Sequence, residues 1–113
     1  MAMEIRPRQV RNYVTPEGRD AFREWLTSVK DSTARAAIRA RIDRLLLGNL
    51  GDHRRLNGDL YELRIHYGPG YRIYCGDLDG ETVILLCGGT KRTQKKDIQR
   101  ANKYWQELRS RNL

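Results

Sequence analysis

The chain has 113 residues, of which 39% are hydrophobic and 32% charged, and its formal net charge at pH 7 is +8. This length predicts one domain over residues 1–113. The excess of 22 Lys and Arg over 14 Asp and Glu favours a polyanionic partner, either nucleic acid or an acidic protein. The alternative is a basic surface that only keeps the protein soluble.

The sequence also argues against several classes of protein. Its longest apolar run, residues 82–87, is far shorter than the ~20 residues that span a bilayer. The N-terminal stretch MAMEIRPRQV lacks the apolar core of a signal peptide. We therefore expect a cytoplasmic protein whose two cysteines, Cys75 and Cys87, stay reduced and serve as small packing residues. Two cysteines and two scattered histidines give no metal-ligand spacing, so no metal or other cofactor is expected.

The N-terminal part of the chain predicts a helix after an irregular lead. Residues 3–14 alternate poorly, and Pro7 confines them to an edge strand or an irregular segment. Thr15-Pro16 has the pattern of an N-cap followed by a first helical residue. The helix that follows carries its apolar side chains at helical spacing: Phe22, Trp25, Leu26 and Val29.

A second helix is predicted over residues 33–47, and the short break before it makes the pair a helical hairpin. Its apolar stripe consists of Ala34, Ile38, Ile42, Leu45 and Leu46, and Gly48 suits the position after the helix end. Four arginines lie off this stripe: Arg35, Arg39, Arg41 and Arg44. We interpret them as a solvated helix face, with a surface that docks a partner as the alternative.

The C-terminal half predicts strands and one long helix. Residues 48–60 are polar and Gly-rich without periodicity, which is typical of a loop. LYELRIHY (60–67) and YRIYCG (71–76) alternate apolar and polar residues and predict half-buried strands joined at GPG. TVILLCG (82–88), after the hairpin signal Asp79-Gly80, is apolar on both faces and predicts a central, covered strand. Thr93 is expected to cap a helix that ends near residue 110.

These elements predict an α+β fold in which an N-terminal helical hairpin packs on an antiparallel β-meander, followed by a C-terminal helix. A three-residue loop at 68–70 would pair Tyr67 with Tyr71, His66 with Arg72, Ile65 with Ile73 and Arg64 with Tyr74. The next hairpin would pair Leu78 with Glu81, Cys75 with Ile84 and Arg72 with Cys87, so no cross-strand disulfide is expected. One sheet face then holds Glu62, Arg64, His66, Arg72 and Tyr74.

Cations gather at one end of this polar face. GGTKRTQKKDIQR (88–100) carries four cations at the start of a helix, where the helix dipole disfavours positive charge: Lys91, Arg92, Lys95 and Lys96. Because the predicted register brings this stretch beside Arg72, we predict a phosphate-binding site there. A bound phosphate would meet the arginines and the free N–H groups of the helix start. The alternative is a polar face that Glu62 neutralises internally.

A site rich in Arg and Lys, without metal ligands, suits phosphodiester chemistry on RNA, whose own 2′-hydroxyl supplies the nucleophile. Arginines would stabilise the charge that builds on phosphate. His66 or Tyr74 would move protons, with lysine as a weaker alternative. The candidate catalytic residues are therefore Arg64, Arg72, Arg92, His66 and Tyr74, and the candidate RNA-binding residues are Lys91, Lys95 and Lys96.

Three stretches of the chain resemble one family. YELRIHYGPGYRIY, VILLCGGTKRTQKKDIQRA and the upstream RIDRLLLGNLGDHRRL resemble the RelE/ParE superfamily of bacterial toxins. More narrowly, they resemble its HigB-like addiction module killer group, related to a phage Gp49-type protein. The resemblance covers about residues 15–108. It implies a small α+β toxin of a type II toxin–antitoxin system, neutralised by an antitoxin that is often a helix-turn-helix protein. RelE-like members cut mRNA in the ribosomal A site without metal, whereas ParE-like members inhibit DNA gyrase.

The resemblance also implies roles for single residues. Arg72 matches the arginine that RelE-type enzymes place on the scissile phosphate. Lys91-Arg92 matches their Lys-Arg pair, of which the arginine is catalytic. Arg64 stands where those enzymes carry a lysine, and Glu62 replaces their other strand lysine.

One position departs from the pattern of the ribonucleases. Ile98 stands where they carry a C-terminal tyrosine used in acid/base chemistry, and isoleucine cannot transfer protons. This departure favours a protein that does not cleave RNA. The preserved Arg72 and Lys91-Arg92 and the net charge of +8 nevertheless lead us to expect a ribosome-dependent mRNA endoribonuclease that binds the ribosome, mRNA and an antitoxin. A ParE-like, non-enzymatic inhibitor of gyrase is the first alternative. A fold relative that only binds its antitoxin or nucleic acid is the second.

Overall fold

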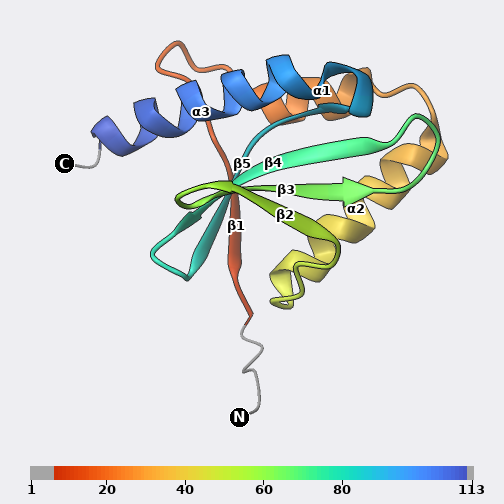
Figure 1. The fold of residues 1–113 in the computed structure, drawn as a ribbon, viewed down its shortest axis with the longest axis horizontal. Helices are drawn as coiled ribbons and strands as arrows, with labels where there is room; N and C mark the ends of the chain where they lie inside the picture. The colour runs from red at the N-terminus through yellow and green to blue at the C-terminus, as the bar shows by residue number, and fades with distance from the viewer. Residues whose placement is uncertain (1–6, 112–113) are drawn as a thin grey trace.

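A computed structural model of the protein describes residues 7–111. Along the chain it has β1 (Gln9–Asn12), α1 (Ala21–Ser28), α2 (Ser32–Leu46), β2 (His53–Asn57), β3 (Leu60–Ile65), β4 (Tyr71–Leu78), β5 (Thr82–Thr90), the short 3-10 helix η1 (Lys91–Thr93) and α3 (Gln94–Arg111). Within this range the strands form one sheet in the order β1-β5-β4-β3-β2 (Figure 1). None of the helices described there combines the length and the hydropathy that crossing a bilayer requires.

The α+β class is confirmed, but the predicted order of elements is wrong at the N-terminus. β1 precedes the two helices, and it pairs in parallel with β5 at one edge of the sheet. The sheet is therefore mixed, with an antiparallel β2–β5 meander extended by one parallel strand. The predicted edge strand near Pro7 falls partly on β1, and residues 3–6 lie outside the described residues.

Capping aspartates determine where α1 and α2 start. Asp20 caps α1, since its carboxylate accepts a hydrogen bond from the backbone N–H of Arg23 (2.9 Å). The predicted start at Thr15-Pro16 is wrong, because Thr15 instead closes a turn by accepting from the N–H of Arg19 (3.0 Å). Asp31 caps α2 in the same way as Asp20. Gly48 follows the end of α2 with φ 85°, as predicted.

The helices cover both faces of the sheet and create two cores. α1 and α2 cover one face, which buries Phe22, Ala34, Ile38, Leu45, Leu63, Ile73 and Leu85 among others. α3 covers the opposite face, which buries Tyr13, Tyr74, Leu86, Cys87, Ala101 and Trp105 among others. β5 is buried along nearly its whole length between these layers, as predicted. Cys75 and Cys87 are both buried and free, as predicted.

Arg41 is the residue of α2 that the sequence pattern misplaced. It was predicted on a solvated face, yet it is only 6% exposed. Its guanidinium donates to the backbone carbonyls of Arg64 (2.5 Å), Leu50 (2.7 Å) and Asp52. It therefore fastens the loop after α2 to the end of β3. Gly51, with φ 62°, allows this approach, because a Cβ there would lie 2.9 Å from the guanidinium.

Arg41→Met is expected to lower the free energy of unfolding by about 2–4 kcal/mol, because three backbone carbonyls lose the buried guanidinium that donates to them. Chemical denaturation measures this loss. Arg39→Met, on the exposed face of the same helix, serves as the control and should change stability by less than about 0.5 kcal/mol. Equal effects of the two substitutions would contradict the fastening role of Arg41.

Both predicted hairpin registers are shifted. β3 and β4 pair Leu63 with Ile73, Arg64 with Arg72 and Ile65 with Tyr71, two residues away from the predicted register. β4 and β5 pair Leu78 with Thr82, Cys75 with Leu85 and, beyond a bulge, Arg72 with Gly89 rather than Cys87. The shift of two residues between β3 and β4 keeps the side chains of both strands on their predicted faces, so the polar face survives. Between β4 and β5 the shift is two residues beyond the bulge but one residue nearer the turn, so Leu85 rather than Ile84 shares a face with Cys75.

Residues 53–57, predicted as part of a loop, form the edge strand β2. β2 pairs antiparallel with β3, and the chain turns back through Gly58-Asp59. The strand is mostly exposed, with Leu56 as its partly buried apolar residue. Its pairing places Arg54 opposite Glu62, which matters for the site described below.

The two ends of the described chain are joined by a polar cluster. α3 was predicted to start at Thr93, and it runs from Gln94 to Arg111. Near its end, the carboxylate of Glu107 accepts hydrogen bonds from the Arg111 guanidinium and the Tyr13 hydroxyl. Arg111 also donates to the carbonyl of Val14 (2.7 Å). The last turn of α3 therefore holds the segment that follows β1.

These bonds make stability depend on pH at the acid end. Hydrogen bonds from Arg111, then from Tyr13, lower the pKa of Glu107 from its ordinary 4.5 to about 2. A lowered pKa means that the carboxylate stabilises the folded state above about pH 4.5 and loses this contribution as the pH falls toward 2. In thermal unfolding, Glu107→Gln should therefore be less stable than wild type at pH 6, with the difference shrinking toward pH 2. A difference that stays constant with pH would contradict this assignment.

Candidate phosphate-binding site

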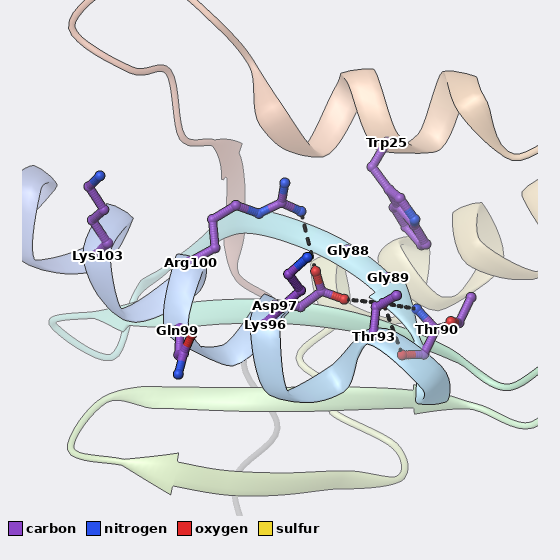
Figure 2. A pocket seen from close by; sticks show the side chains of 10 residues that line it. All are labelled: Trp25, Gly88, Gly89, Thr90, Thr93, Lys96, Asp97, Gln99, Arg100 and Lys103. Atoms are coloured by element: carbon purple, nitrogen blue, oxygen red, sulfur yellow. Dashed lines mark hydrogen bonds and ion pairs between the residues drawn. The ribbon is translucent and has the colours of Figure 1, made fainter.

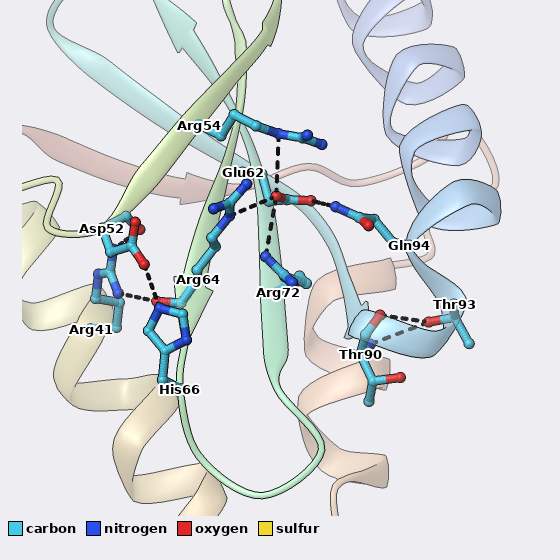
Figure 3. Close-up of polar contacts among 10 residues, drawn as sticks. All are labelled: Arg41, Asp52, Arg54, Glu62, Arg64, His66, Arg72, Thr90, Thr93 and Gln94. Carbon is cyan, nitrogen blue, oxygen red and sulfur yellow. Dashed lines mark hydrogen bonds and ion pairs between the residues drawn. The ribbon is translucent and has the colours of Figure 1, made fainter.

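Glu62 lies at the centre of the polar face of the sheet. It is fully buried, with 0% of its side chain exposed, and one of its oxygens, Oε1, faces three arginines (Figure 3). The distances from Oε1 are 3.2 Å to Arg64 Nε, 3.4 Å to Arg72 Nη1 and 3.7 Å to Arg54 Nε. Oε2 accepts a hydrogen bond from the side-chain amide of Gln94 (2.8 Å). We call Arg54, Glu62, Arg64 and Arg72 the arginine cluster.

The strand pairing explains how the arginine cluster forms. Arg64 and Arg72 lie directly opposite each other on β3 and β4, and Arg54 lies opposite Glu62 on β2. Like charges on neighbouring strands repel, and the carboxylate between them offsets this repulsion. Three guanidinium groups against one carboxylate leave a net charge of +2. Glu62 therefore neutralises the polar face only in part, and an anion can still bind there.

The three arginines of the cluster differ in how far solvent reaches them. The exposed fraction of the side chain is 11% for Arg72, 30% for Arg64 and 48% for Arg54. The Nε atom of Arg72 is buried and has no hydrogen-bond partner within residues 7–111. A buried donor without a partner is costly, so this atom is a point at which a bound oxygen would be stabilising. The exposure of the cluster to solvent therefore increases from Arg72 through Arg64 to Arg54.

Tyr74 lies on the predicted face but is fully buried. It packs in the core under α3, and its hydroxyl has no hydrogen-bond partner within the described residues. Burial, followed by the nearby carboxylate of Glu62, raises its pKa above the ordinary 10. A phenol that is harder to ionise and is closed off from solvent is poorly suited to moving protons for a bound substrate.

His66 leaves the polar face altogether. β3 ends at Ile65, so His66 belongs to the following loop and is exposed. Its Nε2 pairs with the carboxylate of Asp52, on the side where Arg41 holds the loop after α2 (Figure 3). The prediction that His66 faces Arg72 is wrong, because Arg64 takes that position in the observed register.

The four predicted cations of residues 91–96 lie along η1 and the first turn of α3, and all are exposed: Lys91, Arg92, Lys95 and Lys96. The backbone N–H of Lys91 donates to the carbonyl of Gly70 (2.8 Å), which ties η1 to the start of β4. Arg72 lies opposite Gly89, two residues before Lys91. Among the described residues, Gln94 is the member of this segment that contacts the arginine cluster, through its hydrogen bond to Glu62.

Ile98, which stands where the resemblance implies a tyrosine in the ribonucleases, faces the core. It is partly buried and packs in the core between α3 and the sheet. The first turn of α3 instead directs two polar side chains inward, Gln94 toward Glu62 and Asp97 toward Gly89. The opposing charge of Asp97 in this turn also offsets part of the unfavourable interaction between the nearby cations and the helix dipole.

The chain is similar to a known protein family over most of its length. The family model "Phage derived protein Gp49-like (DUF891)" matches residues 24–106. The chain belongs to the Gp49-like family. The resemblance to a phage Gp49-type protein that the sequence suggested is therefore confirmed. A relative from Haemophilus influenzae (strain ATCC 51907 / DSM 11121 / KW20 / Rd), described as an uncharacterized protein, is 51% identical over 87 residues, which cover 77% of this chain and 88% of the relative.

A solved structure shares the fold of this Gp49-like protein. It is the crystal structure of the toxin–antitoxin complex RelBE2 from Mycobacterium tuberculosis, in which the matched chain superimposes with a TM-score of 0.57. The match covers 78% of the present chain and 95% of the other, at 17% sequence identity. The likeness at this identity establishes the fold.

Two members of the site in this Gp49-like protein were not predicted. Arg54 was assigned to a loop, although Asn57-Gly58 between HRRL and LYELRI is a hairpin signal that would have revealed β2. Gln94 was not singled out, because an amide beside three cations carries no charge signal. Gln94 comes close to Glu62 only because the folded chain places it one turn after the end of β5, and the sequence does not show this.

Proposed function

We propose that this protein is the toxin of a type II toxin–antitoxin system and cleaves mRNA on the ribosome without a metal ion. The observation that carries this proposal is the arginine cluster, whose net charge of +2 is concentrated around one buried carboxylate. The cations of η1 and early α3 follow directly after the strand that pairs with Arg72. Such a site matches a phosphodiester backbone in charge and donor geometry.

Each part of the site has a role in the proposed reaction. Arg72 and Arg64 bind the scissile phosphate and stabilise the charge that grows on it as the RNA 2′-hydroxyl attacks. Arg92 adds positive charge at the open side. Lys91, Lys95 and Lys96 bind the neighbouring RNA. Glu62 positions the arginines and does not contact RNA, since it is fully buried.

A second candidate function rests on the groups available for proton transfer. Tyr74 is closed off in the core, His66 is turned toward Asp52, and Ile98 is apolar. This supports a ParE-like inhibitor of DNA gyrase, which would use the same basic surface to bind its target without chemistry. For the ribonuclease, a lysine of η1 or early α3 would have to serve, helped by the charge stabilisation of the arginines.

An antitoxin is the proposed protein partner in either case. The fold neighbour RelBE2 was solved as a toxin–antitoxin complex. By the same family relation we propose a cytoplasmic antitoxin, of the helix-turn-helix type, that neutralises this protein. A short reading frame for such an antitoxin beside this gene would support the proposal.

One experiment separates the candidate functions. The protein is expressed in bacteria from an inducible promoter, and mRNA 5′ ends are mapped beside the supercoiling state of a reporter plasmid. Cuts positioned in the ribosomal A site are the expected result. Intact mRNA together with an SOS response would overturn the ribonuclease and support gyrase inhibition. Intact mRNA and normal supercoiling would overturn both and leave a protein that binds without poisoning.

A further inference from the structure

A groove of about 680 Å³ lies between α1 and α3 at the end of β5, and its lining does not include Glu62 (Figure 2). Trp25 of α1 forms one wall, Lys96, Arg100 and Lys103 of α3 form the other, and Gly88-Gly89 form the floor. We call this space the α1–α3 groove. Its volume lies within the range of sites that hold nucleotide-sized ligands.

The sheet topology and two glycines create the α1–α3 groove. β1 pairs only with residues 82–85 of β5, so the second half of β5 has no strand beside it on that edge within the described residues. At Gly88 a Cβ would lie 2.1 Å from Trp25 Cε3, and at Gly89 it would lie 1.8 Å from Asp97 Oδ2. Trp25 and Asp97 can therefore lie directly on β5 only because these two positions are glycine. The glycines thus let the Trp25 indole and the Asp97 carboxylate lie close against β5 at the bottom of the groove.

The α3 wall is a line of cations. Lys96, Arg100 and Lys103 are spaced i, i+4 and i+7, so they share one helix face and extend over about 10 Å. All three are exposed. Asp97 lies among them, and it is occupied by the Thr93 hydroxyl and by Arg100 at 3.5 Å. Three cations against one carboxylate leave a net charge of +2 in the groove.

The Trp25 wall adds an aromatic surface to this charge. Trp25 is partly buried, and it packs at a tilt against Phe22 and Tyr71, which hold the ring in place. A fixed indole beside a row of cations is the combination with which proteins bind single-stranded nucleic acid, since bases stack on the ring and phosphates pair with the cations. An acidic peptide would use the cations alone and leave the indole without a role.

We propose that the α1–α3 groove is a second binding site, for a single-stranded RNA segment, with a base on Trp25 and phosphates on Lys96, Arg100 and Lys103. The first turn of α3 separates this groove from the arginine cluster, because Gln94 faces Glu62 while Lys96 and Arg100 line the groove. RNA that leaves the cluster across this turn enters the groove. The choice of RNA as the ligand rests on the proposed function.

The test measures binding of a fluorescein-labelled ten-nucleotide oligouridylate by anisotropy over a series of salt concentrations. The test variant is Lys96→Gln/Lys103→Gln. The control is Arg39→Gln/Arg44→Gln, which removes the same charge from exposed positions on α2. We expect the test variant to bind at least about ten-fold more weakly at 50 mM salt and to lose about 1.4 from the slope of log K against log salt. The control variant should stay close to wild type.

A second measurement tests whether a base of the oligouridylate stacks on the indole of Trp25. In a Trp105→Phe background, the remaining tryptophan emission comes from Trp25 and should be quenched by the oligouridylate but not by inorganic phosphate. If Trp105→Phe does not fold, wild type is compared with Trp25→Phe instead. An unchanged emission at saturating oligouridylate would overturn the stacking role of Trp25.

Other outcomes of these experiments distinguish failure of the proposed groove from failure of the proposed function. Equal losses in the test and control variants would overturn the groove, because binding would then follow total charge. Binding of an oligoglutamate peptide that depends on Lys96 and Lys103, without such dependence for oligouridylate, would also overturn it in favour of an acidic protein. If mRNA is cut in cells while both variants bind oligouridylate like wild type, the groove fails and the proposed function stands. If the protein cuts no mRNA but its binding of oligouridylate depends on Lys96 and Lys103, the proposed function fails and the groove stands.

Discussion

Arg72→Ala is expected to abolish growth arrest on induction and to lower mRNA cleavage by at least about 100-fold. Arg72 is the most buried arginine of the cluster, and its Nε has no partner within the described residues, so it is best placed to bind a phosphate oxygen in a site poor in water. Removing one such preorganised donor typically costs a factor of 10²–10³ in rate. Growth curves and mapped mRNA 5′ ends measure the loss.

Two controls keep the Arg72 result interpretable. Arg39→Ala removes an exposed arginine from α2 and should leave growth arrest as in wild type. Arg72→Lys keeps the charge but lacks the planar fork of donors, so we expect only partial cleavage. Circular dichroism and thermal unfolding establish that each variant is folded. A folded Arg72→Ala protein that still arrests growth fully would refute the phosphate-binding role.

Glu62→Gln is expected to lower the free energy of unfolding by about 3–5 kcal/mol. The substitution removes the carboxylate that faces three arginines and leaves the buried Arg72 without a counter-charge, which is the costly way to break a buried ion pair. For a domain of this size the whole stability is about 5–15 kcal/mol. The melting temperature should therefore fall by more than about 10 °C.

A double-mutant cycle tests whether the loss in Glu62→Gln comes from the ion pair itself. Glu62→Gln/Arg72→Gln should lose less stability than the two single substitutions added together, because neither residue then leaves an unpaired charge. Glu81→Gln, at an exposed position beside the last hairpin, controls for removing a carboxylate and should shift stability by less than about 0.5 kcal/mol. Strict additivity of the pair would contradict the central role of Glu62.

Alternation in LYELRI and YRIY was enough to predict which residues share the polar face. It could not decide how far the strands slide, since a slip by two residues leaves every side chain on the same face. The predicted loop at 68–70 is in fact the longer connection 66–70, and this difference moves Arg64 from Tyr74 to Arg72. Local pattern therefore predicted Glu62, Arg64 and Arg72 but not Arg54 and Gln94, and the geometry of the site depends on the turn.

Arg41 and Glu62 show why the remaining features were not visible in the sequence. Both carry charge, and periodicity assigns charged residues to solvent. Each is buried because the fold supplies partners from distant segments: backbone carbonyls of the loop after α2 for Arg41, and side chains of β2, β4 and α3 for Glu62. β2 was hidden for a related reason, since an edge strand with one partly buried apolar residue has little hydrophobic signal.

The pairing of β1 with β5 sets a condition on when the chain can complete its fold. Gln9 pairs with Thr82, the Tyr13 hydroxyl donates to Glu107 across 94 positions, and the Val14 carbonyl accepts from Arg111 across 97 positions. During synthesis β1 cannot pair until residues 82–85 of β5 have been made. Contacts between such distant segments slow folding. β1 therefore joins the sheet only after α1, α2 and the strands β2, β3 and β4 have all been synthesised.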